Sequence, residues 1–381
     1  MYNVQKEGGQ MRAWLEIDLE KIKWNVNSLR SILPSGCEIM AVLKADAYGH
    51  GAVPIGKMLN TIGVYSFAVA TVNEGIALRE HGIKGEILIL GYTDLARMKE
   101  VVRYNLKQTV VDEKYGEAMN NCGFPIQAEI KIDSGMHRLG ILAENVPQVE
   151  HVLRLKNLQI KGMFTHLYEA DSLEKEAVEN TKRQIEKFNE LVDKLKERKI
   201  VIPKLHIQSS YGLLNYPALR YDYVRIGIAL FGTLSAKQDK TKVHLDLKPA
   251  LSLKSIVTSV RKLSAGDTAG YSGMYCADKE RTIAAVSIGY ADGIPRNLSG
   301  TGCKAIVHGK KVEIIGKICM DQLLLDVTDV ENVQAQDTVT FIGDEGEEEL
   351  TVLDMAEKSG TIANEIFSRL GERLERKILL W

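Results

Sequence analysis

The stretch Ile39-Met40-Ala41-Val42-Leu43-Lys44-Ala45 is a short, unbroken apolar run that carries a lysine near its end. Seven more apolar, β-branched runs follow it, and segments with helical periodicity separate most of them. Because these runs are continuous rather than alternating, they predict strands buried on both faces, as in a parallel sheet. Eight such units fit a closed (β/α)8 TIM-like barrel, with a doubly wound open sheet as the alternative. The seven later runs are residues 66–72, 86–91, 108–111, 127–133, 162–166, 205–209 and 223–230.

The pattern changes after about Lys242, where helical periodicity almost disappears until residues 353–358. Strand-like runs dominate this part of the chain, and turn residues separate them. The sequence therefore predicts an α/β barrel followed by a mostly β C-terminal domain. The predicted strands of the second domain are residues 250–260, 283–288, 304–308, 312–318, 322–327 and 338–342.

These patterns divide the 381 residues into three predicted parts. Residues 1–11 are polar and are predicted to be a linker-like or disordered start. Residues 12–242 are predicted to form the barrel, and residues 243–381 the mostly β domain. No apolar run reaches the roughly 18 residues that span a bilayer, so we expect no membrane contact by this chain. A linker-like start would also suit the cytoplasmic domain of a larger membrane-anchored protein.

Charge and cysteine content narrow the classes of function. Lys and Arg number 49 against 50 Asp and Glu, a net charge of -1, which gives no basic field for nucleic acid. The five cysteines are scattered and show no CxxC spacing, which favours a reducing, cytoplasmic compartment. Histidines and cysteines lack metal-ligand spacing, so we expect no metal. Walker-type, dinucleotide-binding and nucleophile-elbow motifs are absent as well.

Reactive side chains follow several predicted barrel strands at their C-terminal ends, where this fold keeps its active sites. They are Lys44, Arg138, His166, Ser210 and Arg225. Each alone has an ordinary interpretation, such as a solvated lysine, a core histidine or a structural ion pair. Their joint placement favours a functional site at this end of the barrel.

A lysine that leaves a buried strand can be desolvated, which lowers its pKa and makes its amine nucleophilic. Such lysines form Schiff bases with carbonyl compounds. Small residues and hydroxyls after the seventh and eighth strands, Ser209, Ser210 and Gly227, would provide backbone N–H groups for a phosphate. A Schiff-base lysine beside a phosphate cradle points to pyridoxal phosphate.

The segment Ala41-Val42-Leu43-Lys44-Ala45-Asp46-Ala47-Tyr48-Gly49-His50-Gly51 resembles the cofactor-lysine motif of alanine racemases, fold-type III pyridoxal-phosphate enzymes. The resemblance extends from about Trp14 to Arg376. It includes Ile288-Gly289-Tyr290-Ala291-Asp292-Gly293 and Cys319-Met320-Asp321-Gln322. It implies an eight-stranded barrel, a β domain and a head-to-tail homodimer.

The same resemblance implies a role for each matching residue on the cofactor side. Lys44 would hold pyridoxal 5′-phosphate as a Schiff base and act as one catalytic base. Arg138 would contact the phenolic oxygen of the cofactor and the substrate, and Lys131 matches a lysine that is often carbamylated. His166 would pack against the ring and hydrogen-bond to Arg225, which would face the pyridine nitrogen. The phosphate would be bound by Tyr48, Ser210, Gly227 and Ile228.

Tyr271 matches the second catalytic base, on the opposite face of the substrate. A tyrosine pKa is about 10 in water, so we expect neighbours such as Arg225 and a cationic His166 to lower it. Tyr271 would enter from the partner subunit, so dimerisation would be required for activity. The remaining matches are substrate-site residues: Tyr290, Arg296, Met320 and Asp321. The resemblance implies that Tyr290 and Met320 also come from the partner subunit.

One residue departs from the alanine racemase pattern. The usual Thr-Ile-x-Tyr-Glu segment is here Thr361-Ile362-Ala363-Asn364-Glu365, so Asn364 replaces a phenol that narrows the substrate pocket. The smaller Asn364 offers a donor and an acceptor and would admit a hydroxymethyl side chain. The substitution is similar to that in the serine/alanine racemases of vancomycin-resistance clusters. It predicts racemisation of serine and alanine, for peptidoglycan precursors ending in D-Ala-D-Ser.

Four alternatives remain open at this point. The chain could be an ordinary alanine racemase, with Asn364 a neutral replacement. A pyridoxal-phosphate-dependent decarboxylase shares the barrel, the β domain and the lysine, but its late Cys-x-x-x-Asp motif does not match Cys319-Met320-Asp321. A non-catalytic pyridoxal-phosphate-binding protein would not need Tyr271. An interaction module fused to a sensor would need none of these residues.

Overall fold

The barrel is closed in the computed structural model, which describes residues 11–379. Within that part of the chain, eight parallel strands pair in a ring, and the pairing of β5 with β6 completes it. The predicted barrel is therefore confirmed, and the open doubly wound sheet is excluded. The strands are β2 (Glu38–Val42), β3 (Ser66–Val69), β4 (Glu86–Ile89), β5 (Lys107–Val110), β6 (Ile126–Asp133), β8 (Leu158–Phe164), β9 (Lys204–His206) and β10 (Tyr223–Ile226).

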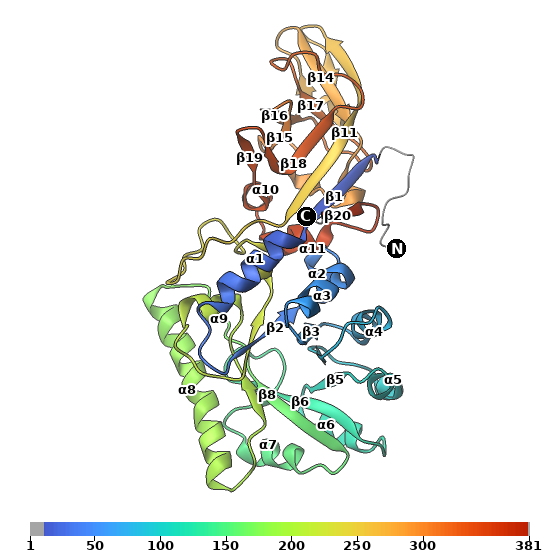
Figure 1. The fold of residues 1–381 in the computed structure, drawn as a ribbon. Coiled ribbons are helices and arrows are strands. Elements are labelled where there is room, and N and C mark those ends of the chain that lie inside the picture. Colours follow the sequence, from blue (N-terminus) through green and yellow to red (C-terminus); the bar gives the residue numbers. More distant parts are fainter. Residues whose placement is uncertain (1–10, 380–381) are drawn as a thin grey trace.

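Helices cover the outside of the barrel (Figure 1). Several begin at a side chain that accepts an N-terminal backbone N–H, as Asp18 does for α1 and Asp112 for α6. The longest, α8, has an apolar stripe through Ile185, Phe188 and Val192 that is buried against the barrel. The helices are α1 (Leu19–Arg30), α3 (Ala52–Thr61), α4 (Val72–Glu80), α5 (Met98–Arg103), α6 (Glu113–Asn120), α7 (Val146–Leu153), α8 (Lys175–Glu197) and α9 (Ser210–Asn215).

The C-terminal part is built on a second sheet in the order β19-β18-β15-β16-β17-β14-β11-β1-β20. Its strands pair antiparallel, apart from β1 with β20. Helices α10 (Val352–Ser359) and α11 (Ala363–Arg369) follow the last hairpin. The strands are β11 (Leu251–Leu263), β14 (Arg281–Val286), β15 (Lys304–Val307), β16 (Lys310–Ile315), β17 (Leu323–Asp326), β18 (Thr338–Glu345), β19 (Glu348–Leu350) and β20 (Glu375–Leu379), with a small β12 (Thr268–Ala269) and β13 (Tyr275–Cys276) hairpin beside them.

Strand β1 (Ala13–Asp18) corrects the expectation that residues 12–242 all belong to the barrel. It pairs antiparallel with β11 and parallel with β20, in the second sheet. Its side chains alternate, with Ala13, Leu15 and Ile17 buried and the residues between them partly exposed. This alternation is typical of a sheet covered on one face, unlike the barrel strands. The predicted start at residues 1–11 lies, except for Met11, outside the described residues.

The two parts meet at the segment that follows β2. Figure 1 shows α2 (Lys44–Tyr48) and α11 at the junction between the barrel and the β-rich part. Arg376 Nε, on β20, donates to the Gly49 carbonyl at 2.9 Å, and a side chain at Gly49 would overlap the Phe367 carbonyl. The second domain therefore holds the segment that contains Lys44. None of the described helices has both the length and the apolarity needed to cross a membrane.

Candidate active site

Lys44 stands at the C-terminal end of β2, at the start of a left-handed turn. Ala45, Asp46, Ala47 and Tyr48 all have φ between 52 and 55°, and none of them is glycine. This conformation costs roughly 1–2 kcal/mol per residue for L-amino acids. A run of four such residues persists only where the surrounding structure holds it, as is common at functional sites.

His50 is one of the groups that hold this turn. Its Nδ1 lies 2.9 Å from the Tyr48 carbonyl, its ring stacks on Phe231 at 4.2 Å between centroids, and it meets Phe367 edge-on at 4.7 Å. Complete burial lowers the pKa of His50 to about 3, so the ring is neutral and Nδ1–H donates. His50 therefore joins the lysine turn to both the barrel and α11.

The Lys44 side chain is partly buried at the mouth of the barrel. Burial lowers the pKa of its amine, the nearby Arg138 charge lowers it further, and Glu74 partly opposes both. A lowered pKa increases the neutral, nucleophilic fraction of the amine. This environment matches the expectation drawn from the sequence.

Ser210, Gly227 and Tyr48 come together beside the lysine turn. Ser210 Oγ accepts the backbone N–H of Gly227 at 3.2 Å and of Ala229 at 3.4 Å. A Cβ at position 227 would lie 2.6 Å from the Tyr48 hydroxyl, so glycine allows the phenol to approach the backbone. Burial raises the pKa of Tyr48 to about 12, which keeps it a hydrogen donor. The Gly227 and Ala229 N–H groups donate to Ser210, so the hydroxyls of Ser210 and Tyr48, with Ile228 next in the chain, are the groups that fit a phosphate.

Arg225 lies on β10 with its guanidinium buried between two histidines. Nη1 is 2.7 Å from His206 Nδ1, and Nη2 is 3.3 Å from His166 Nδ1 and 2.7 Å from the Thr165 carbonyl. Because arginine can only donate, both Nδ1 atoms must accept. Burial, with the Arg225 charge, lowers the pKa of His166 to about 3. The expectation of a cationic His166 is therefore wrong. Of these three side chains, Arg225 is the one that carries the positive charge.

A chain of buried polar and charged groups that the sequence did not reveal extends from Arg225 through His206. His206 Nε2 lies 2.7 Å from Glu129 Oε2, and Glu129 Oε1 lies 3.2 Å from Lys107 Nζ, which also pairs with Glu86 at 2.8 Å. Burial opposes ionisation of Glu129, but His206 and Lys107 outweigh it and lower its pKa. One sequence feature could have indicated this cluster, namely charged residues inside otherwise apolar strands. Charged side chains are almost never buried without partners, so such residues predict buried pairs.

Lys131 is buried near the Arg225 side chain, and its Nζ donates to the Ile132 carbonyl at 2.6 Å. Burial, followed by the Arg225 charge, lowers the pKa of Lys131 to about 7. Arg138, seven residues later, is exposed and acts electrostatically on Lys44 and Lys131. The structure therefore brings the predicted cofactor-side residues to one end of the barrel.

The predicted substrate residues of the second domain lie elsewhere. Tyr271 is 65% exposed and Met320 53% exposed, and in the described residues no hydrogen bond or ring contact joins Tyr271 to Lys44. Tyr271 lies in the short turn after β12, where Lys317 Nζ donates to Ser272 Oγ at 3.0 Å, so it belongs to the β-rich part and not to the barrel. Within one chain, Lys44 and Tyr271 are therefore separated.

Two loops of the second domain hold the other substrate candidates together. Tyr290 N–H donates to the Cys319 carbonyl at 3.0 Å, which places Tyr290 beside the loop that carries Met320. Asp321 pairs with Arg373 at 2.7 Å. Arg296 is exposed on the short turn after Pro295. These predicted substrate residues therefore lie on exposed loops of the second domain.

Asn364 is on α11, the helix that packs against the lysine turn α2. Its Oδ1 is buried and, among the described residues, has no hydrogen-bond partner. A buried acceptor without a donor costs about 1–3 kcal/mol. Such an atom next to the lysine turn fits a donor supplied by a ligand.

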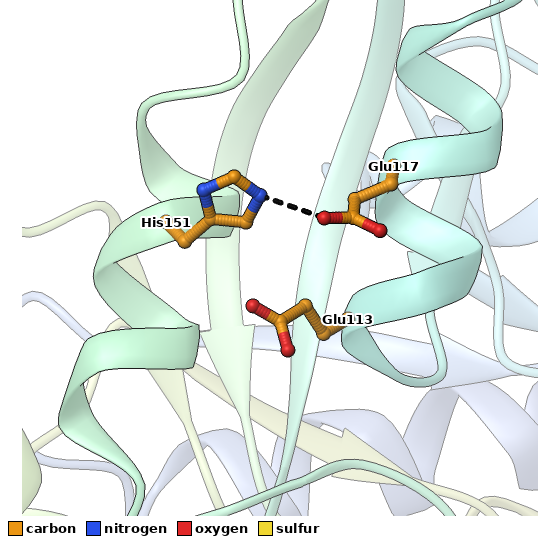
Figure 2. Close-up of side chains that lie close together, drawn as sticks. All are labelled: Glu113, Glu117 and His151. Atoms are coloured by element: carbon orange, nitrogen blue, oxygen red, sulfur yellow. Dashed lines mark hydrogen bonds and ion pairs between the residues drawn. The ribbon is translucent and has the colours of Figure 1, made fainter.

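One further group of metal-ligand type lies on the outer helices, where Glu113 and Glu117 of α6 face His151 of α7 (Figure 2). Motif spacing could not reveal it, because the side chains come from two helices and His151 follows Glu117 by 34 residues. His151 Nε2 and Glu117 Oε1 are 3.0 Å apart and both side chains are exposed. We interpret the group as a surface contact between neighbouring helices.

The barrel, the lysine turn and the phosphate cradle define the chain as a pyridoxal-phosphate-binding barrel protein with a C-terminal β domain. Residues 17–235 match the N-terminal domain model of alanine racemase, and residues 250–378 match its C-terminal domain model. The chain therefore belongs to the alanine racemase family, whose cofactor is pyridoxal 5′-phosphate.

Three relatives place the chain within this family. It is 45% identical to an amino-acid racemase of Enterococcus faecalis over 363 residues, 95% of this chain and 51% of that protein. It is 38% identical to a serine/alanine racemase of Enterococcus gallinarum, over 96% of this chain and 51% of that protein. It thus spans about half the length of these two relatives. The crystal structure of alanine racemase from E. faecalis superposes with a TM-score of 0.89 at 34% identity, covering 98% of this chain and 99% of that one.

Proposed function

We propose that the chain is an isomerase that racemises serine and alanine with pyridoxal 5′-phosphate, using Lys44 and Tyr271 as its two bases. The observation that carries this proposal is the lysine turn, in which a partly buried amine with a lowered pKa lies beside the Ser210 and Tyr48 hydroxyls. When bound, pyridoxal phosphate withdraws electrons from the substrate Cα and acidifies its proton. Membership of the alanine racemase family supports the assignment.

Lys44 and Tyr271 would each hold or release a proton on one face of the substrate. Lys44 can accept a proton because burial favours its neutral amine. Arg225 keeps its proton: burial lowers its pKa only to about 10, and Glu129 partly offsets that effect. Arg225 would therefore offer an N–H donor to the pyridine nitrogen without giving up its own proton. An arginine at this position would keep the cofactor a weaker electron sink, which would limit side reactions such as transamination.

Serine as a substrate is supported by Asn364. Its unpartnered buried Oδ1 could accept the hydroxyl hydrogen of serine, which alanine lacks. The similarity to a serine/alanine racemase of E. gallinarum supports the same specificity. We further propose that the D-serine produced serves peptidoglycan precursors ending in D-Ala-D-Ser, which lower glycopeptide binding.

A second copy of the chain would complete the site. Tyr271, Tyr290 and Met320 are exposed side chains of a type common at interfaces, and among the described residues no hydrogen bond or ring contact joins them to Lys44 of the same chain. We propose a homodimer in which each subunit gives Lys44 to one site and Tyr271 to the other. Such a closed two-fold arrangement uses the same pair of surfaces twice.

The deciding experiment measures kcat/KM for L-serine and L-alanine side by side, with added pyridoxal phosphate. A serine value near or above the alanine value would support the serine/alanine assignment. Turnover of alanine alone would leave an ordinary alanine racemase, with Asn364 a neutral replacement. Release of CO2, or no turnover with the cofactor bound, would favour the decarboxylase or the non-catalytic alternative.

A further inference from the structure

Glu74 connects two neighbouring strand ends at the mouth of the barrel. It lies in the first turn of α4, and its Oε1 accepts the backbone N–H of Ala45 at 2.7 Å. Its Oε2 accepts the N–H of Ala70 at 2.7 Å and of Thr71 at 3.1 Å. One carboxylate thus binds the residue after Lys44 on one side and the end of β3 on the other. Hydrogen bonds to an ionised acceptor are about twice as strong as neutral ones.

The bond to Ala45 acts at the start of the left-handed turn. The N–H groups of Ala47 and Gly49 bond within the turn, to Leu43 and Ala45 carbonyls, both at 2.8 Å. The N–H of Ala45 instead donates to Glu74, outside the turn. Ala45 is also the first residue of this turn with positive φ, at 52°. The contact with Glu74 therefore holds the backbone where the conformation changes, directly after Lys44.

We propose that Glu74 is a positioning residue that fixes the main chain of Lys44 by bonding Ala45 to the end of β3. The consequence for catalysis rests on the function proposed above, whereas the effect on the turn does not. The carboxylate charge also partly opposes the lowering of the Lys44 pKa by burial. Glu74 would thus influence both where the amine is placed and how basic it is.

Helix capping is the competing role for Glu74. It forms a capping box with Thr71, whose Oγ1 accepts the Glu74 N–H at 3.3 Å. An aspartate can also form a capping box in this chain, because Asp354 forms one with Thr351 at the start of α10. Glu74→Asp would therefore keep the cap and the charge. Its side chain is one methylene shorter, so it could not also reach Ala45.

The test measures backbone hydrogen exchange of the peptide covering residues 43–50 in the cofactor-free protein, together with cofactor affinity and kinetics. For Glu74→Asp we expect exchange about tenfold faster, cofactor binding about tenfold weaker and a lower kcat, with the substrate KM within about twofold. Thr71→Ala is the matched control, because it breaks the cap and leaves the Oε1 contact intact. It should leave the exchange of residues 43–50 unchanged.

The variant Glu74→Gln is a second, independent test of the Ala45 contact. Its amide has a single acceptor oxygen, so its NH2 group must face either the Ala45 N–H or the pair on Ala70 and Thr71. The single oxygen can accept two N–H groups from Ala70 and Thr71 but only one from Ala45, so we expect it to face the pair and residues 43–50 to lose protection as in Glu74→Asp. The proposal is overturned if Thr71→Ala reproduces the effect, or if both Glu74 variants leave exchange unchanged. Absence of racemase turnover in the unsubstituted chain would refute the proposed function, while the exchange data would still decide the role of Glu74.

Discussion

At the scale of single residues, the chemistry of the site depends on which groups carry protons. Arg225 donates to both flanking histidines, so His166 and His206 are neutral acceptors at Nδ1. Burial then leaves Lys44 and Lys131 with lowered pKa values in the same positive environment. The two lysines are thus prepared for chemistry that requires an uncharged amine.

Lys131 should react with carbon dioxide near neutral pH. The neutral amine nitrogen attacks the carbon of CO2, an N–C bond forms and one N–H proton leaves to water. Because its pKa is about 7 rather than the ordinary 10.5, much of Lys131 is neutral at pH 7.5 and less at pH 6. We expect a carbamate signal by 13C NMR with labelled bicarbonate that weakens as the pH falls. The signal should be absent from Lys131→Gln, and its absence from the unsubstituted protein at pH 8 would contradict the prediction.

Asn364 should determine how well serine is used. In Asn364→Tyr the phenol would fill the space for a hydroxymethyl group and remove the unpartnered acceptor. We expect serine kcat/KM to fall by about tenfold to a hundredfold, while alanine kcat/KM changes by less than about threefold. Ser368→Ala, at an exposed position on the same helix, is the control. An unchanged serine value would remove Asn364 from the specificity argument.

At the scale of helices and strands, periodicity located the eight barrel strands, because continuous apolar runs between helical segments are typical of buried parallel strands. It missed α11, whose seven residues are too few for a helical period and include Asn364 and Glu365. It also missed the Glu129 and His206 contact, since their strands are brought together only by barrel closure. Long-range polar pairs of this kind have no local signature. The motif around Lys44 indicated which residues form the cofactor-binding part of the site, but it did not indicate that Ala45–Tyr48 form a left-handed turn.

His50, which joins α2 to α11 and the barrel, should make folding stability depend on pH. Its folded pKa is about 3 and its ordinary value 6.5, so the unfolded chain binds the proton more tightly. The stability it contributes is complete above pH 6.5 and is lost as the pH falls towards 3. In His50→Asn, the amide can still donate to Tyr48 and does not titrate. We expect the slope of unfolding free energy between pH 6 and 4 to decrease by about 1.4 kcal/mol per pH unit.

Urea titrations at fixed protein and cofactor concentration would measure that slope, because ligand and subunit concentrations shift apparent stability. The control is the same pair of proteins between pH 7.5 and 8.5, where the difference in unfolding free energy between His50→Asn and the unsubstituted chain should stay constant. Parallel curves across the whole range would mean that His50 does not titrate differently on unfolding.

At the scale of the whole molecule, the fold separates the two proposed bases onto two domains. Lys44, Arg225 and the phosphate cradle lie at the barrel mouth, and Tyr271 and Met320 are exposed on the β-rich part. Domain closure within one chain would have to break the packing of α2 against α11 and the Arg376 contact with Gly49. A second subunit can bring the bases together without disturbing either contact. Assembly is therefore the simpler route to a complete site.

Mixed dimers test this arrangement directly. Lys44→Ala and Tyr271→Phe should each be inactive alone, because every site in either dimer lacks one base. When the two chains pair at random in equal amounts, half of the dimers are mixed, and each mixed dimer contains one intact site. Co-expression should then restore about a quarter of the activity of the unsubstituted dimer. Activity no greater than that of the two parents would mean that Lys44 and Tyr271 of the same chain work together, and the shared site would have to be abandoned.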